Sequence, residues 1–123
     1  MMHELHVESC PLNGVEVLTL AGAVEQLSFP NLAVTIGRSM HERSARIVLD
    51  CQRVGYIGST QLRELMEFMA YARTLGGDIK FAGLAPSIRT VAGLVAGKVK
   101  FDCYGSVPEA VESFRECEAP AAR

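Results

Sequence analysis

Two neighbouring hydroxyl side chains, Ser59 and Thr60, stand where the sequence changes from an apolar run to a helical pattern. The run is predicted as a buried strand ending at Asp50, followed by a loop and then by a helix. A hydroxyl at a helix start can cap the free amide groups there, which stabilises the helix by ~1 kcal/mol. The same position suits a regulatory switch, because a phosphate would add about −1.5 to −2 charges beside the positive end of the helix dipole. Both interpretations stay open on these residues alone.

Motifs for catalysis are incomplete in this sequence. The stretch Gly93-x-x-x-Gly97-Lys98 has one residue too few for a phosphate-binding loop, and Val99 stands where that loop has Ser or Thr. Ser59 follows one glycine but lacks the two flanking glycines of a nucleophile elbow. Glu64 and Glu67 lie three residues apart on one predicted helix, which is typical of an exposed, charged face. We therefore expect no catalytic residues and no enzymatic activity.

The cysteines do not form a metal-binding pattern. They are scattered at positions 10, 51, 103 and 117, without the C-x-x-C pair that zinc sites usually contain. The sequence thus predicts no metal site, no cofactor and reduced thiols that behave as small hydrophobic residues. A small enzyme that uses Ser59 or Cys51 is the most remote of the alternatives.

Length and charge restrict the function classes further. The chain has 123 residues, of which 49% are hydrophobic and 21% charged, the balance of one soluble globular domain. Its net charge of −2 offers no concentrated basic patch, so neither nucleic acid nor an anionic membrane is an expected partner. No apolar run approaches the roughly 20 residues of a membrane span, and no secretory signal is evident at Met1. We expect a cytoplasmic protein without membrane insertion.

Hydrophobic periodicity predicts strands that alternate with helices, in the order β-β-α-β-α-β-α-β-α. Asn13-Gly14 is a strong hairpin signal between the first two strands. The fold class is therefore α/β, a mixed β-sheet with packed helices, whose helices cover either one face or both. The predicted strands are 3–8, 15–22, 46–50, 78–82 and 99–103, and the predicted helices are 29–42, 59–75, 86–96 and 106–114.

The stretch Asp50–Leu62 resembles a pattern of the STAS domain, the fold of anti-sigma-factor antagonists and of the cytoplasmic tails of sulphate transporters. The family pattern is Asp-Leu-Ser-x-Val-x-Phe-Ile-Asp-Ser-Ser-Gly-Leu. Tyr56 takes the place of its Phe and Thr60 that of its second Ser, whereas Gly58 replaces the acid before Ser59 and Gln61 replaces a glycine. The residues kept from the pattern are Asp50, Val54, Ile57, Ser59 and Leu62.

The resemblance extends over nearly the whole chain. Gly22-Ala23-Val24-Glu25 is similar to the family's Gly-Glu-Ile-Asp after the second strand, and Phe29-Pro30-Asn31-Leu32 to the start of its next helix. Leu84–Leu94 and Phe101–Val111 also follow the family. The resemblance implies a single STAS-like domain over residues 1–118, and residues 119–123 are predicted to be a frayed tail.

In this family the serine aligned with Ser59 is phosphorylated by a partner that is both a serine kinase and the anti-sigma factor. The resemblance therefore implies a bacterial phosphoprotein that regulates transcription by partner switching: the unmodified form binds the kinase and frees the sigma factor, and phosphorylation ends the binding. Ser59, or Thr60 beside it, is the implied phosphorylation site. The implied partner-binding residues are Glu25, Asp50, Gly58, Ser59, Thr60, Gln61 and Leu62, with Glu25 and Asp50 flanking the site.

Two further interpretations follow from the same resemblance. Some STAS proteins are structural subunits, on the ATPase of a lipid transporter or in a sensory scaffold, and need no phosphorylation. The missing acid at Gly58 makes this alternative a serious one. The sequence does not decide whether the chain forms a homodimer.

Overall fold

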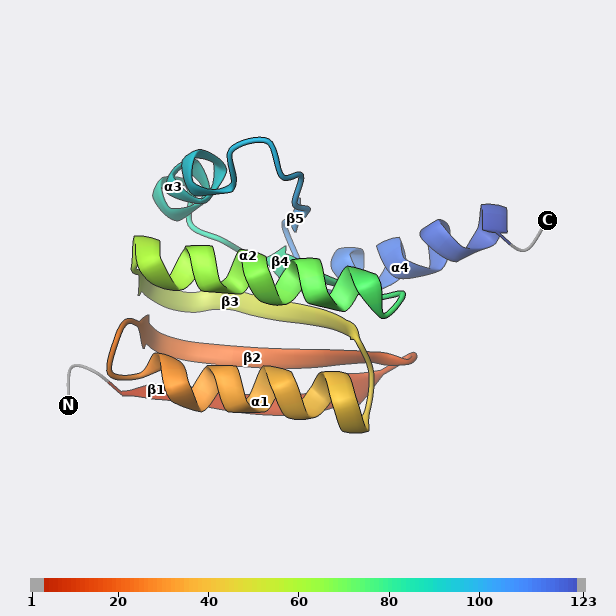
Figure 1. The fold of residues 1–123 in the computed structure, drawn as a ribbon, viewed down its shortest axis with the longest axis horizontal. Helices are drawn as coiled ribbons and strands as arrows, with labels where there is room; N and C mark the ends of the chain where they lie inside the picture. Colours follow the sequence, from red (N-terminus) through yellow and green to blue (C-terminus); the bar gives the residue numbers. More distant parts are fainter. Residues whose placement is uncertain (1–3, 122–123) are drawn as a thin grey trace.

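The computed structural model describes residues 4–121, with side chains described as far as Arg115. It confirms the α/β fold class and the predicted order of strands and helices (Figure 1). In chain order the elements are β1 (Leu5–Leu12), β2 (Val15–Val24), α1 (Phe29–Glu42), β3 (Arg46–Ile57), α2 (Ser59–Thr74), β4 (Asp78–Ala82), α3 (Pro86–Ala96), β5 (Cys103–Tyr104) and α4 (Val107–Ala121).

The five strands form one mixed sheet in the order β1-β2-β3-β4-β5. β1 and β2 are antiparallel, and every later pair is parallel. The predicted hairpin turn is confirmed: Asn13 and Gly14 have φ values of 55° and 80°, the left-handed conformation that a two-residue hairpin turn requires. Because β2, β3 and β4 run in the same direction, β2 and β3 both deliver the chain to the same edge of the sheet.

Helices cover both faces of the sheet, which the sequence left open. Leu18 of β2 packs into the larger core beneath α1, α2 and α3. Its neighbour Val17 points to the other face and packs with Val111 and Phe114 of α4. Side chains of β2 thus alternate between two cores, as the strand period of two residues dictates. Figure 1 shows α1 and α2 side by side over the first face.

β3 is longer than predicted. The strand continues past Asp50 to Ile57, so the predicted loop after Asp50 is wrong. The second half of β3 pairs with the stretch of β2 from Ala21 to Val24, and the register shifts twice, between Thr19 and Ala21 and between Gly22 and Ala23. These irregularities break the alternation of buried and exposed residues, which is why the sequence pattern resembled a loop. As a consequence, only Gly58 separates the end of β3 from α2.

The C-terminal elements also differ from the prediction. The last strand is Cys103–Tyr104 and not 99–103, since Val99 is exposed before the sheet is reached. Glu109 accepts a hydrogen bond from the backbone of Gly105 at 3.2 Å, and its own amide donates to Ser106 Oγ at 3.4 Å. α4 reaches Ala121, within the stretch predicted as a tail, and residues 122–123 lie outside the described part. The domain boundary at residue 118 stays a prediction.

Candidate functional site

The start of α2 exposes two hydroxyl groups. Gly58 is extended, with φ −67° and ψ 151°, and its amide donates to the carbonyl of Val24 at 3.0 Å. Its carbonyl then accepts the first helical hydrogen bond, from Leu62 at 2.9 Å. Gly58 is therefore the N-cap, and no side chain caps the helix, so the interpretation of Ser59 or Thr60 as a cap is wrong. Both side chains are exposed to solvent in the first turn of α2.

These hydroxyl groups line a hollow of about 720 Å³ formed by three segments. Glu25 and Gln26 come from the turn after β2, Tyr56 from the end of β3, and Ser59 and Thr60 from α2. Gly58, Gln61, Phe29, Pro30 and Glu64 complete the lining. Most of these side chains are polar, and the two carboxylates make the hollow acidic.

Ser28 holds the turn that brings Glu25 to the hollow. Its hydroxyl donates to the carbonyl of Ala23 at 2.7 Å and accepts from the amide of Glu25 at 3.0 Å. The amides of Ser28 and Phe29 both donate to the carbonyl of Glu25, at 3.1 Å and 2.8 Å. The turn is thus fixed by its own hydrogen bonds, and Glu25 and Ser59 lie across one hollow although they are far apart in the sequence.

Two predicted partner-binding residues do not lie on this surface. Asp50 pairs with Ala82 of β4, seven residues before Ile57, which is about 23 Å along a strand. The expectation that Asp50 flanks Ser59 is therefore wrong, because β3 continues where a loop was predicted. Leu62 is fully buried in the larger core, so its side chain is not available for direct contact with a partner.

Gly58 and Gln61 depart from the family pattern together, and the structure gives a physical reason. A Cβ atom at Gly58 would collide with Oε1 of Gln61, a residue that is only 8% exposed. Where the family pattern has an acid followed three residues later by glycine, this chain has a glycine followed by a long amide. The Gln61 side chain thus occupies the space next to the position of the missing acid.

The paired departure predicts a coupled response to mutation. Gly58→Asp alone should change the free energy of unfolding by less than about 1 kcal/mol, because Asp suits the N-cap position but its Cβ must displace the flexible end of Gln61. Gly58→Asp should be more favourable in the Gln61→Gly background than alone, since the collision is then removed, although the glycine itself costs about 1 kcal/mol inside the helix. Urea unfolding of the single and double variants measures the coupling. Additive effects within about 0.3 kcal/mol would show that the two positions do not interact.

Two apolar side chains near the hollow were not predicted as site residues. Tyr56 lines the hollow and is 54% exposed, and Leu27, in the turn after β2, is 73% exposed. Exposed aromatic and aliphatic side chains beside a polar hollow are typical of protein-binding surfaces. Leu27 carried a weak signal in the sequence, as an isolated leucine in an otherwise polar turn.

Cys51 lacks the properties of a nucleophile. Its side chain is buried, and this burial raises the pKa of the thiol far above its ordinary value. The nearby Asp50 and Cys103 raise this pKa further, by smaller amounts. A buried, protonated thiol reacts slowly, because the thiolate is the nucleophilic form.

Thiol labelling of the native chain tests this difference. Exposed Cys10 should react quickly with a disulfide reagent at pH 8, whereas Cys51 should react only once the chain is unfolded in guanidinium. Mass spectrometry of peptides at increasing times gives the rate at each position. Equal rates at Cys10 and Cys51 in the native chain would contradict this assignment.

Among residues 4–115, no three His, Cys, Asp or Glu side chains gather in an arrangement that could hold a metal ion. In the same described part of the chain, every helix is too short or too polar to cross a membrane.

The mixed five-stranded sheet with α2 beginning directly after β3 defines a STAS domain. The chain belongs to the STAS family whose description is "Mlab, STAS domain", and the match covers residues 12–96. The comparison with curated proteins gave no match.

Solved structures share this fold at low identity. An anti-sigma factor antagonist from Mycobacterium paratuberculosis is 18% identical, with a TM-score of 0.74 over 90% of this chain and 94% of that one. The Bacillus cell fate determinant SpoIIAA, in its phosphorylated form, is 15% identical, with a TM-score of 0.69 over 90% and 99%. The murine anion transporter Slc26a9 is 13% identical, with a TM-score of 0.70 over 85% of this chain but only 18% of the transporter. At these identities the likeness shows the fold alone.

Proposed function

We propose that this STAS domain is an anti-sigma-factor antagonist that acts in the bacterial cytoplasm. It binds an anti-sigma factor that is also a serine kinase, and phosphorylation of Ser59 ends the binding. The observation that carries this proposal is the hydroxyl of Ser59 in the first turn of α2. It is exposed in a hollow open to solvent, and it does not cap the helix. In this proposal the chain is the substrate of a kinase and not itself an enzyme.

The backbone around Ser59 favours a phosphate. The first amides of a helix have no acceptor within the helix, and no acidic residue stands in the first turn of α2. A phosphate on Ser59 would therefore lie near free amide groups and the positive end of the helix dipole. It would also add negative charge to a hollow already lined by Glu25 and Glu64.

The same charges explain how modification would release a partner. A partner that fits the hollow needs basic or neutral hydrogen-bonding groups facing Glu25, and apolar groups facing Leu27 and Tyr56. A phosphate at the centre of such an interface must lose its hydration and repels any acidic group opposite. Gly58, Thr60 and Gln61 line the same hollow and would contact the partner beside Ser59.

Phosphate mapping tests the proposed site. The full chain is incubated with the kinase and ATP, and the modified peptide is identified by mass spectrometry. Phosphate is expected on Ser59, and Ser59→Ala should abolish it while Thr60→Ala should not. Labelling at Thr60 would move the switch by one residue. Labelling only outside Ser59 and Thr60 would overturn the proposed site.

A specific observation favours a second candidate function. Gln61 fills the space beside Gly58, so the acid that precedes the serine in the family pattern is absent. A site without this acid fits a STAS subunit that binds constitutively, in a transporter ATPase complex or a sensory scaffold. Recovery of a transporter ATPase with the tagged chain, together with the absence of phosphate on Ser59 in cells, would decide for this alternative.

A further inference from the structure

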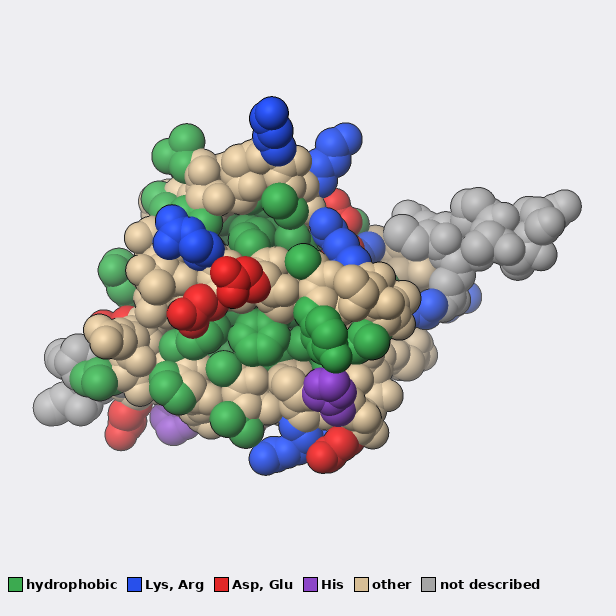
Figure 2. All heavy atoms as spheres, viewed as in Figure 1, with side chains coloured by type: hydrophobic (Ala, Val, Ile, Leu, Met, Phe, Trp, Pro, Cys, Tyr) green, Lys and Arg blue, Asp and Glu red, His purple; other side chains and the backbone are tan. Residues whose placement is uncertain are grey.

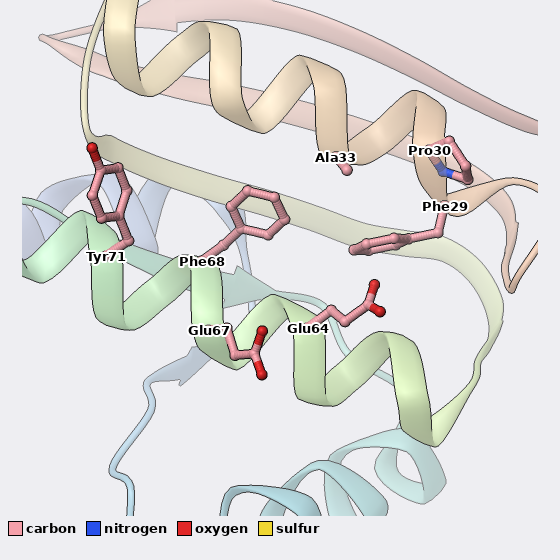
Figure 3. Close-up of a pocket in the computed structure, with 7 residues that line it drawn as sticks. All are labelled: Phe29, Pro30, Ala33, Glu64, Glu67, Phe68 and Tyr71. Atoms are coloured by element: carbon pink, nitrogen blue, oxygen red, sulfur yellow. The ribbon is translucent and has the colours of Figure 1, made fainter.

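A second concave surface runs between α1 and α2. It is a groove of about 550 Å³, and it continues from the hollow at Ser59 because Phe29 and Glu64 border both. Ala33 of α1 and Glu67, Phe68 and Tyr71 of α2 also line this groove (Figure 3). Neither Ser59 nor Thr60 lines this groove.

The floor of the groove is apolar. The rings of Phe29 and Phe68 face each other across it, with centroids 6.5 Å apart and planes tilted by 51°. The small side chain of Ala33 lies on the α1 side, between the two rings, and Tyr71 lies beyond Phe68, where it is 45% exposed. Figure 2 shows the result, a continuous band of hydrophobic side chains on the molecular surface. A continuous apolar band on an otherwise mixed surface marks an interaction site.

The rim of the groove on the α2 side is acidic. Glu64 and Glu67 lie one helical turn apart, and Figure 2 shows two acidic side chains beside the apolar band. Spacing of three residues on a helix is usually read as solvent-exposed charge, but here the carboxylates border an apolar groove. A partner with apolar side chains for the floor and basic side chains for this rim would be complementary to both.

The shape of the groove favours a helix as its occupant. From Glu64 to Tyr71, α2 advances seven residues, which is about 10 Å or two helical turns. The backbone groups of α1 and α2 are paired within their own helices, so the groove offers no edge to which an extended strand could add. An amphipathic helix can place apolar residues at i, i+3 or i+4, and i+7 into such a groove.

We propose that the groove between α1 and α2 binds an amphipathic helix of a partner protein, with apolar side chains on Phe29, Phe68 and Tyr71 and Lys or Arg against Glu64 and Glu67. The inference rests on the proposed function in one respect. Because the groove continues from the hollow at Ser59, the helix is taken to belong to the protein that binds this hollow. Binding in the groove needs no phosphate on Ser59.

The test is selection of displayed helical peptides on the full chain. Binders that are lost on the Tyr71→Ala variant but kept on Leu94→Ala, an exposed leucine of α3 that lines neither the groove nor the hollow, are sequenced and synthesised. They are expected to share an apolar stripe at helical spacing and a flanking Lys or Arg. Their affinity should fall at least tenfold on Glu67→Lys, a change not used in the selection, and less than twofold on the control Glu8→Lys.

The remaining outcomes separate this proposal from its rivals. Binders without basic residues, binders unaffected by Glu67→Lys, or the absence of any binder sensitive to Tyr71→Ala would overturn it. Self-association of the free chain that Tyr71→Ala abolishes in sedimentation would also overturn it, because the occupant would then be a second copy. Ser59→Ala cannot be phosphorylated at that position. If peptides bind the groove of this variant as they bind the wild-type chain, the groove proposal stands even where the phosphorylation switch fails.

Discussion

Replacing Ser59 by glutamate is expected to weaken the complex with the kinase about a hundredfold, which corresponds to about 2.7 kcal/mol. Ser59 is exposed in the first turn of α2 and lines one hollow together with Glu25 and Glu64. A carboxylate placed there must be dehydrated on binding and adds a third negative charge to the interface. Like charges brought together in an interface cost several kcal/mol, so this loss is of the expected size. Isothermal titration of the kinase with wild-type and variant chains measures it.

A matched control separates the effect of the added charge from the effect of its position in the hollow. Ser87 is exposed in the first turn of α3, so Ser87→Glu places the same charge in the first turn of another helix. We expect Ser87→Glu and Ser59→Ala to bind within about threefold of wild type. Equal affinities for Ser59→Glu and wild type would show that the kinase does not contact this hollow.

Replacing Lys80 by alanine is expected to destabilise the domain by about 2–5 kcal/mol, as truncation of a long buried side chain does. Lys80 of β4 is only 2% exposed. Its ammonium donates to Ser113 Oγ at 2.7 Å and lies 4.3 Å from the centre of the Phe114 ring. Asp102 is 3.8 Å away. The side chain thus joins the sheet to α4, and urea unfolding of the variant measures its contribution.

Lys80→Met separates packing from charge. Methionine keeps most of the buried chain but loses the charge, and replacing buried charged groups by apolar ones is often neutral. We expect Lys80→Met to change the free energy of unfolding by less than about 1.5 kcal/mol. A loss as large as that of Lys80→Ala would mean that the ammonium and its bond to Ser113 stabilise α4 and the apolar stem does not.

The helices were predictable because their signals are local. α1 begins and ends as predicted at Phe29 and Glu42, where Pro30 fits the first turn and the apolar residues keep helical spacing. α3 shows the same agreement over Pro86–Ala96. The short strand Asp78–Ala82 was also predicted with its bounds, since Ile79 and Phe81 stand on either side of Lys80 with the two-residue period of a strand.

The long second half of β3 could not be predicted in the same way. Its residues pair only with β2, across two shifts of register, and they expose Gln52, Arg53 and Tyr56. A half-exposed strand with irregular pairing lacks the period of two residues on which prediction depends. The last strand is even less predictable, because it consists of two residues whose pairing with β4 is set by the sheet and not by their own sequence.

The candidate site was predicted in part. Ser59 and Thr60 are exposed at the start of a helix as expected, and Glu25 lies beside them, because the family resemblance carried long-range information. Asp50 was misplaced once the loop after it was misjudged. Tyr56 and the groove between α1 and α2 depend on side chains that meet only in the folded chain, so no local pattern indicated their role, and Leu27 carried only a weak signal.

Release of the sigma factor is the most direct test of the antagonist function. A fluorescently labelled sigma factor is bound to the kinase, and the full chain is added while the anisotropy of the label is followed. Unmodified chain should displace the sigma factor, and chain phosphorylated on Ser59 should leave it bound at the same concentration. A sigma factor that stays bound at saturating unmodified chain, or that both forms release equally, would contradict the proposed function.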